Sequence, residues 1–312
     1  MLPCRTSGKR WISTLSTETT EDNSSVQPHH GSHSSSIQLV RTHGDSIQHA
    51  MILSYFDDSS DPRHEHYFAS GGLMAEESQW KNFHVPWAVA TIDLKEPFRS
   101  SDCECQQKQF SSWSKEDCNK LMDRLVGVIC EQRLHGYASI VPIDEYRSVF
   151  PDSGEYDAYY LSVKHTIINM AEIGHGERER YGFGGMKCWF EHSETTSGPT
   201  RTIYHQLRSV DTWEQAKSLD SNIYFRDKNL HPLQAADLVA REAFKHFLNQ
   251  GKRNTRIPLR RMSDLLNFIV WRRPQLEYLR DNGGPDNLEL LTSWGRDHRP
   301  HPPQFETYWR NY

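Results

Sequence analysis

The segment Pro232–Ala240, with the sequence Pro-Leu-Gln-Ala-Ala-Asp-Leu-Val-Ala, restricts the fold of this 312-residue chain more than any other feature. Proline suits the first turn of a helix, because the backbone nitrogen there needs no partner within the helix. An apolar stripe at helical spacing follows, formed by Leu233, Ala236, Ala240 and Phe244. Asp237 lies beside this stripe, and a carboxylate at the edge of a packed face needs a cation, a donor or a metal as partner. The pattern predicts a helix from Pro232 to about Leu248 that carries one acid into the protein.

Two predicted strands also end in acids. The apolar run Met51–Phe56 leads directly into Asp57 and Asp58, and the run Met186–Phe190 leads into Glu191. Mg²⁺ and Mn²⁺ prefer oxygen ligands, and metal-assisted cleavage of phosphodiesters uses clusters of carboxylates. The sequence therefore predicts a site for Mg²⁺ or Mn²⁺ with three principal ligands, Asp57, Glu191 and Asp237. In a two-metal reaction, Asp57 would bridge the ions and the other two acids would each hold one.

Four further residues are weaker candidates for the same site. Asp58 and Asp227 are additional acids that would bind the metal or simply start a turn. Gln234 precedes Asp237 by three residues and so lies on the same side of the predicted helix, where it would orient that acid or contact substrate. Arg241 would contact substrate or pair with Asp237, from which it is four residues away.

Other groups have weaker metal-binding patterns. Asp102 or Glu104 would supply a helix-borne acid, although their surroundings predict a loop over residues 95–113. The alternative to Glu191, should the strand register shift, is Glu194. Histidines and a cysteine pair complete the candidates, and each is more simply explained as a surface or core residue: His64, His66, His205 and the Cys103-x-Cys105 pair.

Strands alternate with helices after an initial hairpin, which predicts an α/β fold with a mixed sheet flanked by helices. The further strands are expected over Tyr67–Met74, Tyr137–Val141 and Asn222–Phe225. Gly71-Gly72 in the first of these indicates a bulge or a close approach of another backbone. The further helices are expected over Trp80–Ala90, from Ser114 to about Gly136, and over Tyr156–Ile173, Thr200–Ser209 and Leu265–Val270.

The chain divides into three parts by composition. Residues 1–47 are predicted to be a disordered tail, because residues 12–37 hold 12 Ser or Thr and almost no aliphatic pattern. Residues 48–250 form the predicted domain, and residues 251–312 a basic helical extension that is loosely attached beyond about Asp281. No apolar run predicts a secretory signal or a membrane span, so we expect a cytoplasmic protein with free thiols at its 6 cysteines.

Charge is unevenly distributed along the chain. Residues 57–77 contain six acids and one arginine, whereas residues 241–280 contain ten Lys or Arg and three acids. An acidic centre next to a basic surface suits a metal-dependent enzyme that acts on a polyanion, so nucleic acid is the expected partner. The alternative is an ordinary solvated helical surface.

Several of these motifs together resemble the family called "domain of unknown function 3800". The resemblance spans about residues 50–250 and rests on four segments: Tyr55–Ser59, Phe68–Leu73, Ile223–Asp227 and Leu233–Val239. It implies an RNase H-like fold and a suspected nuclease, a hydrolase of RNA or DNA. The first motif departs from the family's usual Asp-Glu-Ser-Gly, since this chain has Asp-Asp-Ser-Ser.

Three functions follow as hypotheses. The first is the metal-dependent nuclease, which requires the three principal acids to converge. The second is a non-catalytic member of the same fold that binds nucleic acid or protein, and the altered first motif favours it. The third is a metal-dependent phosphoesterase or transferase for a small substrate. No nucleophile triad, phosphate-binding glycine loop or dinucleotide fingerprint is present.

Overall fold

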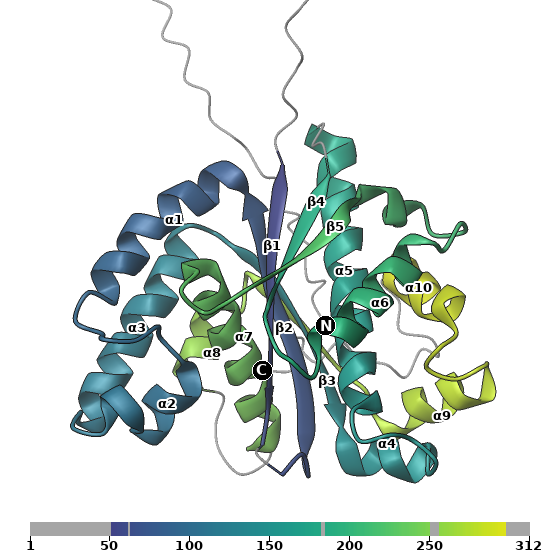
Figure 1. Ribbon diagram of the computed structural model, residues 1–312, viewed down its shortest axis with the longest axis horizontal. Helices are drawn as coiled ribbons and strands as arrows, with labels where there is room; N and C mark the ends of the chain where they lie inside the picture. The colour runs from purple at the N-terminus through teal and green to yellow at the C-terminus, as the bar shows by residue number, and fades with distance from the viewer. Residues whose placement is uncertain (1–50, 62, 182–184, 250–255, 298–312) are drawn as a thin grey trace, which may run out of the picture. The chain divides into compact units, whose positions relative to one another are not determined.

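Six strands form one mixed sheet in the computed structural model, which describes residues 51–61, 63–181, 185–249 and 256–297 (Figure 1). Their order across the sheet is β5-β4-β1-β2-β3-β6. The strands are β1 (Ile52–Ser60), β2 (Tyr67–Glu76), β3 (His135–Pro142), β4 (Met186–Glu191), β5 (Leu219–Arg226) and β6 (Leu266–Val270). The first three form an antiparallel meander, while β4, β5 and β6 each pair in parallel with a neighbour.

Helices cover both faces of the sheet, so the fold has three layers (Figure 1). The first layer contains α1 (Glu77–Ala90), α2 (Ser100–Cys105), α3 (Lys115–Glu131), α7 (His231–Leu248) and α8 (Ile257–Arg261). The second layer contains α4 (Ile143–Val149), α5 (Asp157–Tyr181), α6 (Ser197–Arg208), α9 (Arg273–Asp281) and α10 (Leu288–Asp297). Two short 3₁₀ turns, Lys108–Phe110 and Glu214–Ser218, connect longer elements. The predicted α/β class, with a mixed sheet flanked by helices, is confirmed.

Helix α7 is the central helix of the first layer, and it lies across β1 and β2. The predicted apolar stripe is buried, and so are all the other residues from Pro232 to Phe244, which the stripe did not predict. The sheet accepts the helix closely because Gly71 has no side chain: a Cβ there would come within 2.9 Å of the Ala240 backbone. The predicted close approach at this glycine is therefore present, and it brings α7 against the strand next to β1.

Two sequence predictions about local structure were wrong. Residues 95–113 were expected to be irregular, yet they include α2, which packs beside α7. Leu265–Val270 was expected to be an amphipathic helix, yet Leu266–Val270 is strand β6. A short apolar run does not distinguish a buried strand from a helix, and here pairing with β3 decides the outcome.

The region after residue 250 belongs to the same packed unit. Strand β6 extends the sheet beyond β3, and α9 and α10 pack in the second layer, where Leu291 is buried. The loose attachment expected beyond Asp281 is therefore wrong for α10. The predicted tail at 1–47 and residues 298–312 lie outside the described residues. Among the helices described, none is long and apolar enough to cross a bilayer.

Candidate functional site

Strand alternation places two of the predicted acids on the face of the sheet that α7 covers. Phe56 of β1 pairs with Phe190 of β4, and both belong to the second core. The next residues, Asp57 and Glu191, therefore point to the opposite face. Asp237 approaches this point from α7, whose face toward the sheet is buried. β1 continues to Ser60, so Asp57 lies within the strand and not after it.

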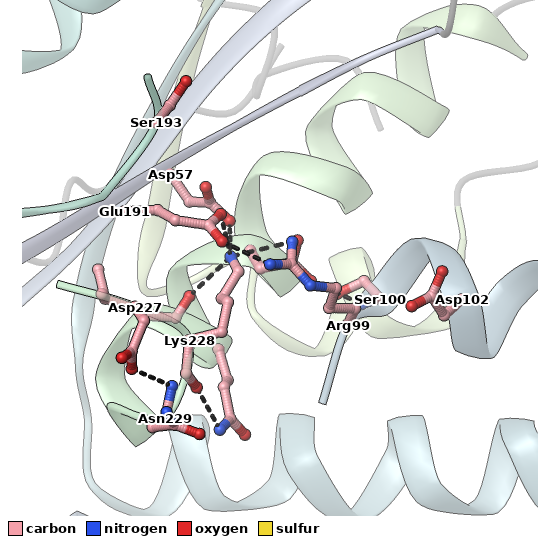
Figure 2. Close-up of polar contacts among 12 residues, drawn as sticks. Asp57, Arg99, Ser100, Asp102, Glu191, Ser193, Asp227, Lys228 and Asn229 are labelled. Atoms are coloured by element: carbon pink, nitrogen blue, oxygen red, sulfur yellow. Dashed lines mark hydrogen bonds and ion pairs between the residues drawn. The ribbon is translucent and has the colours of Figure 1, made fainter. Parts of the chain in front are cut away.

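The three principal acids converge on the ammonium group of Lys228, and Figure 2 shows Asp57 and Glu191 there. The Nζ atom contacts Asp57 and lies 3.2 Å from Glu191 Oε2 and 3.5 Å from Asp237 Oδ1. The side chain of Lys228 is only 2% exposed. One cation thus touches acids from β1, β4 and α7, which are far apart in the sequence.

A turn between β5 and α7 directs Lys228 inward. The Asn229 N–H donates to Asp227 Oδ1 at 2.9 Å, and the Leu230 N–H donates to the Asp227 carbonyl at 3.3 Å. This is the usual way in which an aspartate stabilises its own turn. Asp227 is exposed and lies outside the cluster of acids, at the end of the strand.

A second cation and one backbone donor complete the site. Arg99, which precedes α2, donates from NH2 to Glu191 Oε1 at 2.7 Å, and its side chain is 42% exposed. The Ser100 N–H donates to Asp237 Oδ2 at 2.6 Å. The start of helix α2 and the residue before it, in a segment that the sequence predicted to be a loop, therefore contact two of the three acids. We call Asp57, Glu191, Asp237, Lys228 and Arg99 the carboxylate site.

Burial and charge act differently on the acids. Burial raises the pKa of Asp57 well above its usual value; Lys228 opposes this, while Asp237 and Glu191 reinforce it. Burial also acts to raise the pKa of Asp237, but Lys228 and the hydrogen bonds from Ser100 outweigh it, and the net pKa is lowered. The three acids also hold the pKa of Lys228 above its usual value despite its burial. The lysine is therefore a fixed positive charge among these acids.

Gln234 and Asp58 are not among the side chains that contact the Lys228 ammonium group in the described part of the chain. Gln234 is buried, and its amide donates to the Lys228 carbonyl at 2.7 Å and accepts from Trp87 Nε1 at 2.9 Å. It therefore fixes the turn that carries Lys228. Asp58 follows Asp57 in the strand and so faces the other side of the sheet. There it lines a cavity of about 10 Å³, roughly the volume for one water molecule, together with Tyr159 and Thr200, and this cavity is also lined by Asp57 and Glu191.

Arg241 lies one helical turn beyond Asp237 and contacts a different acid. Its Nε donates to Glu104 Oε2 at 2.9 Å, and its NH2 lies 2.8 Å from the same atom. Glu104 also contacts Arg256 at 2.8 Å and Lys245 at 3.5 Å. The helix-borne acid considered from the sequence is therefore bound to cations, and it does not reach the carboxylate site among the contacts described.

The histidine and cysteine candidates do not join the carboxylate site. His66 lies near Asp61 and Glu65, but Asp61 already accepts the backbone N–H groups of Glu65 and His66 and so forms a turn. His205 is exposed on α6. Cys103 is buried whereas Cys105 is exposed, so the two thiols occupy different surroundings.

Sequence reasoning missed Lys228 and Arg99. The only available signal for Lys228 was its place between a predicted strand and the helix of Asp237. Lysines are rarely buried, so the residue type alone predicts a surface position. Arg99 lay in a segment expected to be a loop.

Comparisons with protein families and with curated proteins give no indication of the chemistry. No protein-family model matches the chain, and no curated protein matches it. The resemblance described above stays a prediction.

Proposed function

We propose that this protein is a metal-dependent nuclease with an RNase H-like fold, which hydrolyses phosphodiester bonds of RNA or DNA. The observation that supports it is the convergence of Asp57, Glu191 and Asp237 on one cationic atom, Lys228 Nζ. We assign the sheet to this fold. Its strands β1, β2 and β3 form an antiparallel meander, and β4 and then β5 follow in parallel on the other side of β1. In this proposal the acids lie at the middle of the sheet, under α7.

The donor set suits a divalent metal. Carboxylate oxygens are the ligands that Mg²⁺ and Mn²⁺ prefer, and three carboxylates here face two cations, Lys228 and Arg99. Lys228 contacts all three carboxylates, so an ion held by Asp57, Glu191 and Asp237 would displace the ammonium group from the point where they meet. A bound ion would activate water for attack and stabilise the leaving oxygen.

The chain's own groups would position the substrate phosphate. Arg99 is bound to Glu191 through one nitrogen, and its partly exposed guanidinium retains donors for a phosphate oxygen. The Ser100 N–H fixes one oxygen of Asp237. Lys228 keeps a positive charge where negative charge would develop on the reacting phosphate.

A cleavage assay tests this proposal. Labelled single-stranded and duplex RNA and DNA are incubated with Mg²⁺, with Mn²⁺ or with a chelator. We expect metal-dependent cleavage by the wild type and none by Asp57→Asn or Asp237→Asn. Asp227→Asn is the matched control and should retain cleavage, because Asp227 is an exposed turn residue on the neighbouring segment. Cleavage that survives in both site variants would contradict the proposal, as would cleavage of nucleotide monoesters alone.

One observation favours a second function. Lys228 already occupies the point at which the three acids meet, and an internal ammonium can balance acids in a site that has lost its metal. The protein would then be a non-catalytic RNase H-like module that binds nucleic acid or protein. Binding of nucleic acid by a well-folded wild type with no cleavage under any metal would support this function.

A further inference from the structure

Three aromatic side chains form a row across the sheet, beside the carboxylate site. Tyr55 of β1, Trp189 of β4 and Tyr224 of β5 pair in register. The rings of Tyr55 and Trp189 are 6.2 Å apart and 19° from parallel, and those of Trp189 and Tyr224 are 4.5 Å apart and 22° from parallel. The row therefore presents stacked rings from the centre of the sheet to its edge strand.

A charged row lies next to it on the same face. Asp57 and Glu191 follow Tyr55 and Trp189 by two residues. Arg226 follows Tyr224 in the same way and lies opposite Glu191 in the register of β4 and β5. Rows separated by two residues are about 7 Å apart along a strand, which one nucleotide can bridge. The Arg226 guanidinium lies 5.3 Å from the centre of the Trp189 ring and so joins the two rows.

The aromatic row becomes accessible toward the edge. Tyr55 is only 6% exposed, whereas Trp189 and Tyr224 are half-buried and Arg226 is exposed. β5 is the edge strand, and α7 lies over β1 and β2. Tyr224 belongs to neither hydrophobic core. Its ring stacks on the ring of Trp189, which packs against the core of the first layer. Packing of the core therefore does not explain why an aromatic ring is present here.

We propose that Tyr224, backed by the stacked ring of Trp189, and Arg226 bind one unpaired nucleotide of a single-stranded nucleic acid whose phosphate reaches the carboxylate site. This inference rests on the proposed function and names its substrate class. Aromatic side chains stack with bases of any sequence, and arginine supplies both a cation for phosphate and a flat surface for stacking. Arg226 and the partly exposed Arg99 give this acidic site the positive charge that a polyanion requires.

The opposite face of β5 offers a matched control. Phe225 adjoins Tyr224 but points to the second core, and the Arg201 guanidinium lies 5.3 Å from its ring. Each face thus carries an arginine 5.3 Å from an aromatic ring, Arg226 over Trp189 of β4 on one and Arg201 over Phe225 on the other, and the first of these stands in the row of Asp57 and Glu191. Variants on the opposite face therefore show the effect of losing an aromatic ring or an arginine in general, which can be separated from loss of nucleotide binding.

Binding is measured without turnover, by fluorescence anisotropy of labelled 12-nucleotide DNA and RNA strands and the matching duplex. Each titration is done in EDTA and in Ca²⁺. We expect Tyr224→Leu to weaken binding of single strands about tenfold, since one base–aromatic stack has this order of effect. Phe225→Leu should bind single strands as tightly as the wild type.

The salt dependence of the same binding tests the arginine. Arg226→Gln should reduce the slope of log K against log salt by about 0.7 for single strands, the value for one lost phosphate contact. Arg201→Gln should leave the slope unchanged. Equal slopes in Arg226→Gln and the wild type would overturn the role of Arg226.

Other outcomes separate this inference from the proposed function. Cleavage that needs Asp57, together with single-strand binding unaffected by Tyr224→Leu, would overturn the inference and retain the nuclease. Single-strand binding that depends on Tyr224, with no cleavage under any metal, would retain the inference and contradict the nuclease. Binding of the duplex as tight as that of the single strand, or no binding at all, would also overturn the inference.

Discussion

One turn of α7 separates two clusters of charged residues with opposite character. Asp237 belongs to the carboxylate site, and Arg241, four residues later, belongs to a second cluster that we call the arginine cluster. Its members are Glu104, Glu242, Arg241, Lys245 and Arg256. The carboxylate site has three acids and two cations, whereas the arginine cluster has two acids and three cations. Both clusters are substantially buried, so burial of charge alone does not distinguish their roles.

The arginine cluster is internally paired. Both oxygens of Glu104 have cationic partners, as described above. Both oxygens of Glu242, which is fully buried, accept from Arg256 at 2.7 and 2.8 Å. Two-pronged contacts of this kind fix geometry as well as charge. The cluster ties α2 and α7 to the segment that precedes α8, and every carboxylate oxygen in it has a partner. We infer a structural role.

The carboxylate site differs because its acids outnumber its cations and share them. Lys228 serves three acids at once, and only Arg99 adds a second positive charge. An excess of buried negative charge costs free energy unless a proton or a further cation binds, which is why the pKa of Asp57 is raised. Incompletely balanced charge, more than buried charge itself, therefore marks the functional candidate.

The largest expected effect comes from removing Lys228. In metal-free buffer, Lys228→Met should lower the free energy of unfolding by about 3–5 kcal/mol, because three buried acids lose their shared cation. Mn²⁺ or Mg²⁺ should restore much of this loss by taking the place of the ammonium. Urea unfolding with and without the metal measures both effects.

Arg256→Met in the arginine cluster is the control for this variant. It should also be destabilised, but divalent metal should not rescue it, because Glu104 keeps Arg241 and Lys245 as partners and Glu242 alone loses its ion pair, so no group of acids is left to hold the metal. Equal rescue of both variants would remove the distinction between the clusters.

An intermediate effect is expected at Glu104. Burial acts to raise the pKa of this carboxyl, but Arg241, Arg256 and Lys245 outweigh it, and the pKa lies below its usual value. A lowered folded-state pKa contributes stability that is present above the unfolded value of about 4.3 and is lost as pH falls through the folded value. Glu104→Gln should therefore cost about 2 kcal/mol at pH 7, in the range for hydrogen bonds to charged groups.

Urea unfolding of wild type and Glu104→Gln from pH 7 to pH 3, in EDTA, measures this contribution. The difference between the two proteins should be constant above about pH 5 and should shrink below about pH 4. A difference that grows as the pH falls would contradict the pairing described for the arginine cluster.

The smallest effect on stability is expected at Arg99. Its side chain is 42% exposed, so Arg99→Gln should change the free energy of unfolding by less than about 1 kcal/mol. If Arg99 contacts substrate phosphate, the same variant should nevertheless reduce cleavage and weaken single-strand binding. Chemical unfolding and the cleavage assay on one protein preparation separate the two effects. A large loss of stability with unchanged cleavage would assign Arg99 to structure, like the arginine cluster.

Much of the fold followed from local patterns in the sequence. The apolar stripe of α7, the alternating or apolar runs of β1 and β4, and the glycine at position 71 each predict a contact that the structure contains. These signals are strong because a helix or a strand must bury one face, and the spacing of its apolar residues shows which. Where the periodicity was weak, the prediction was wrong. Leu266–Val270 was expected to be helical, but it is a strand because it pairs with β3.

Local patterns in the sequence were enough to select Asp57, Glu191 and Asp237 as acids at the boundary of buried elements. That these acids meet, and that Lys228 lies between them, follows from the packing of the sheet and helices and could not be predicted. The physical reason is distance along the chain. Periodicity reports the face on which a residue lies, whereas the partner of a buried charge comes from another element and is fixed by how the sheet and helices pack.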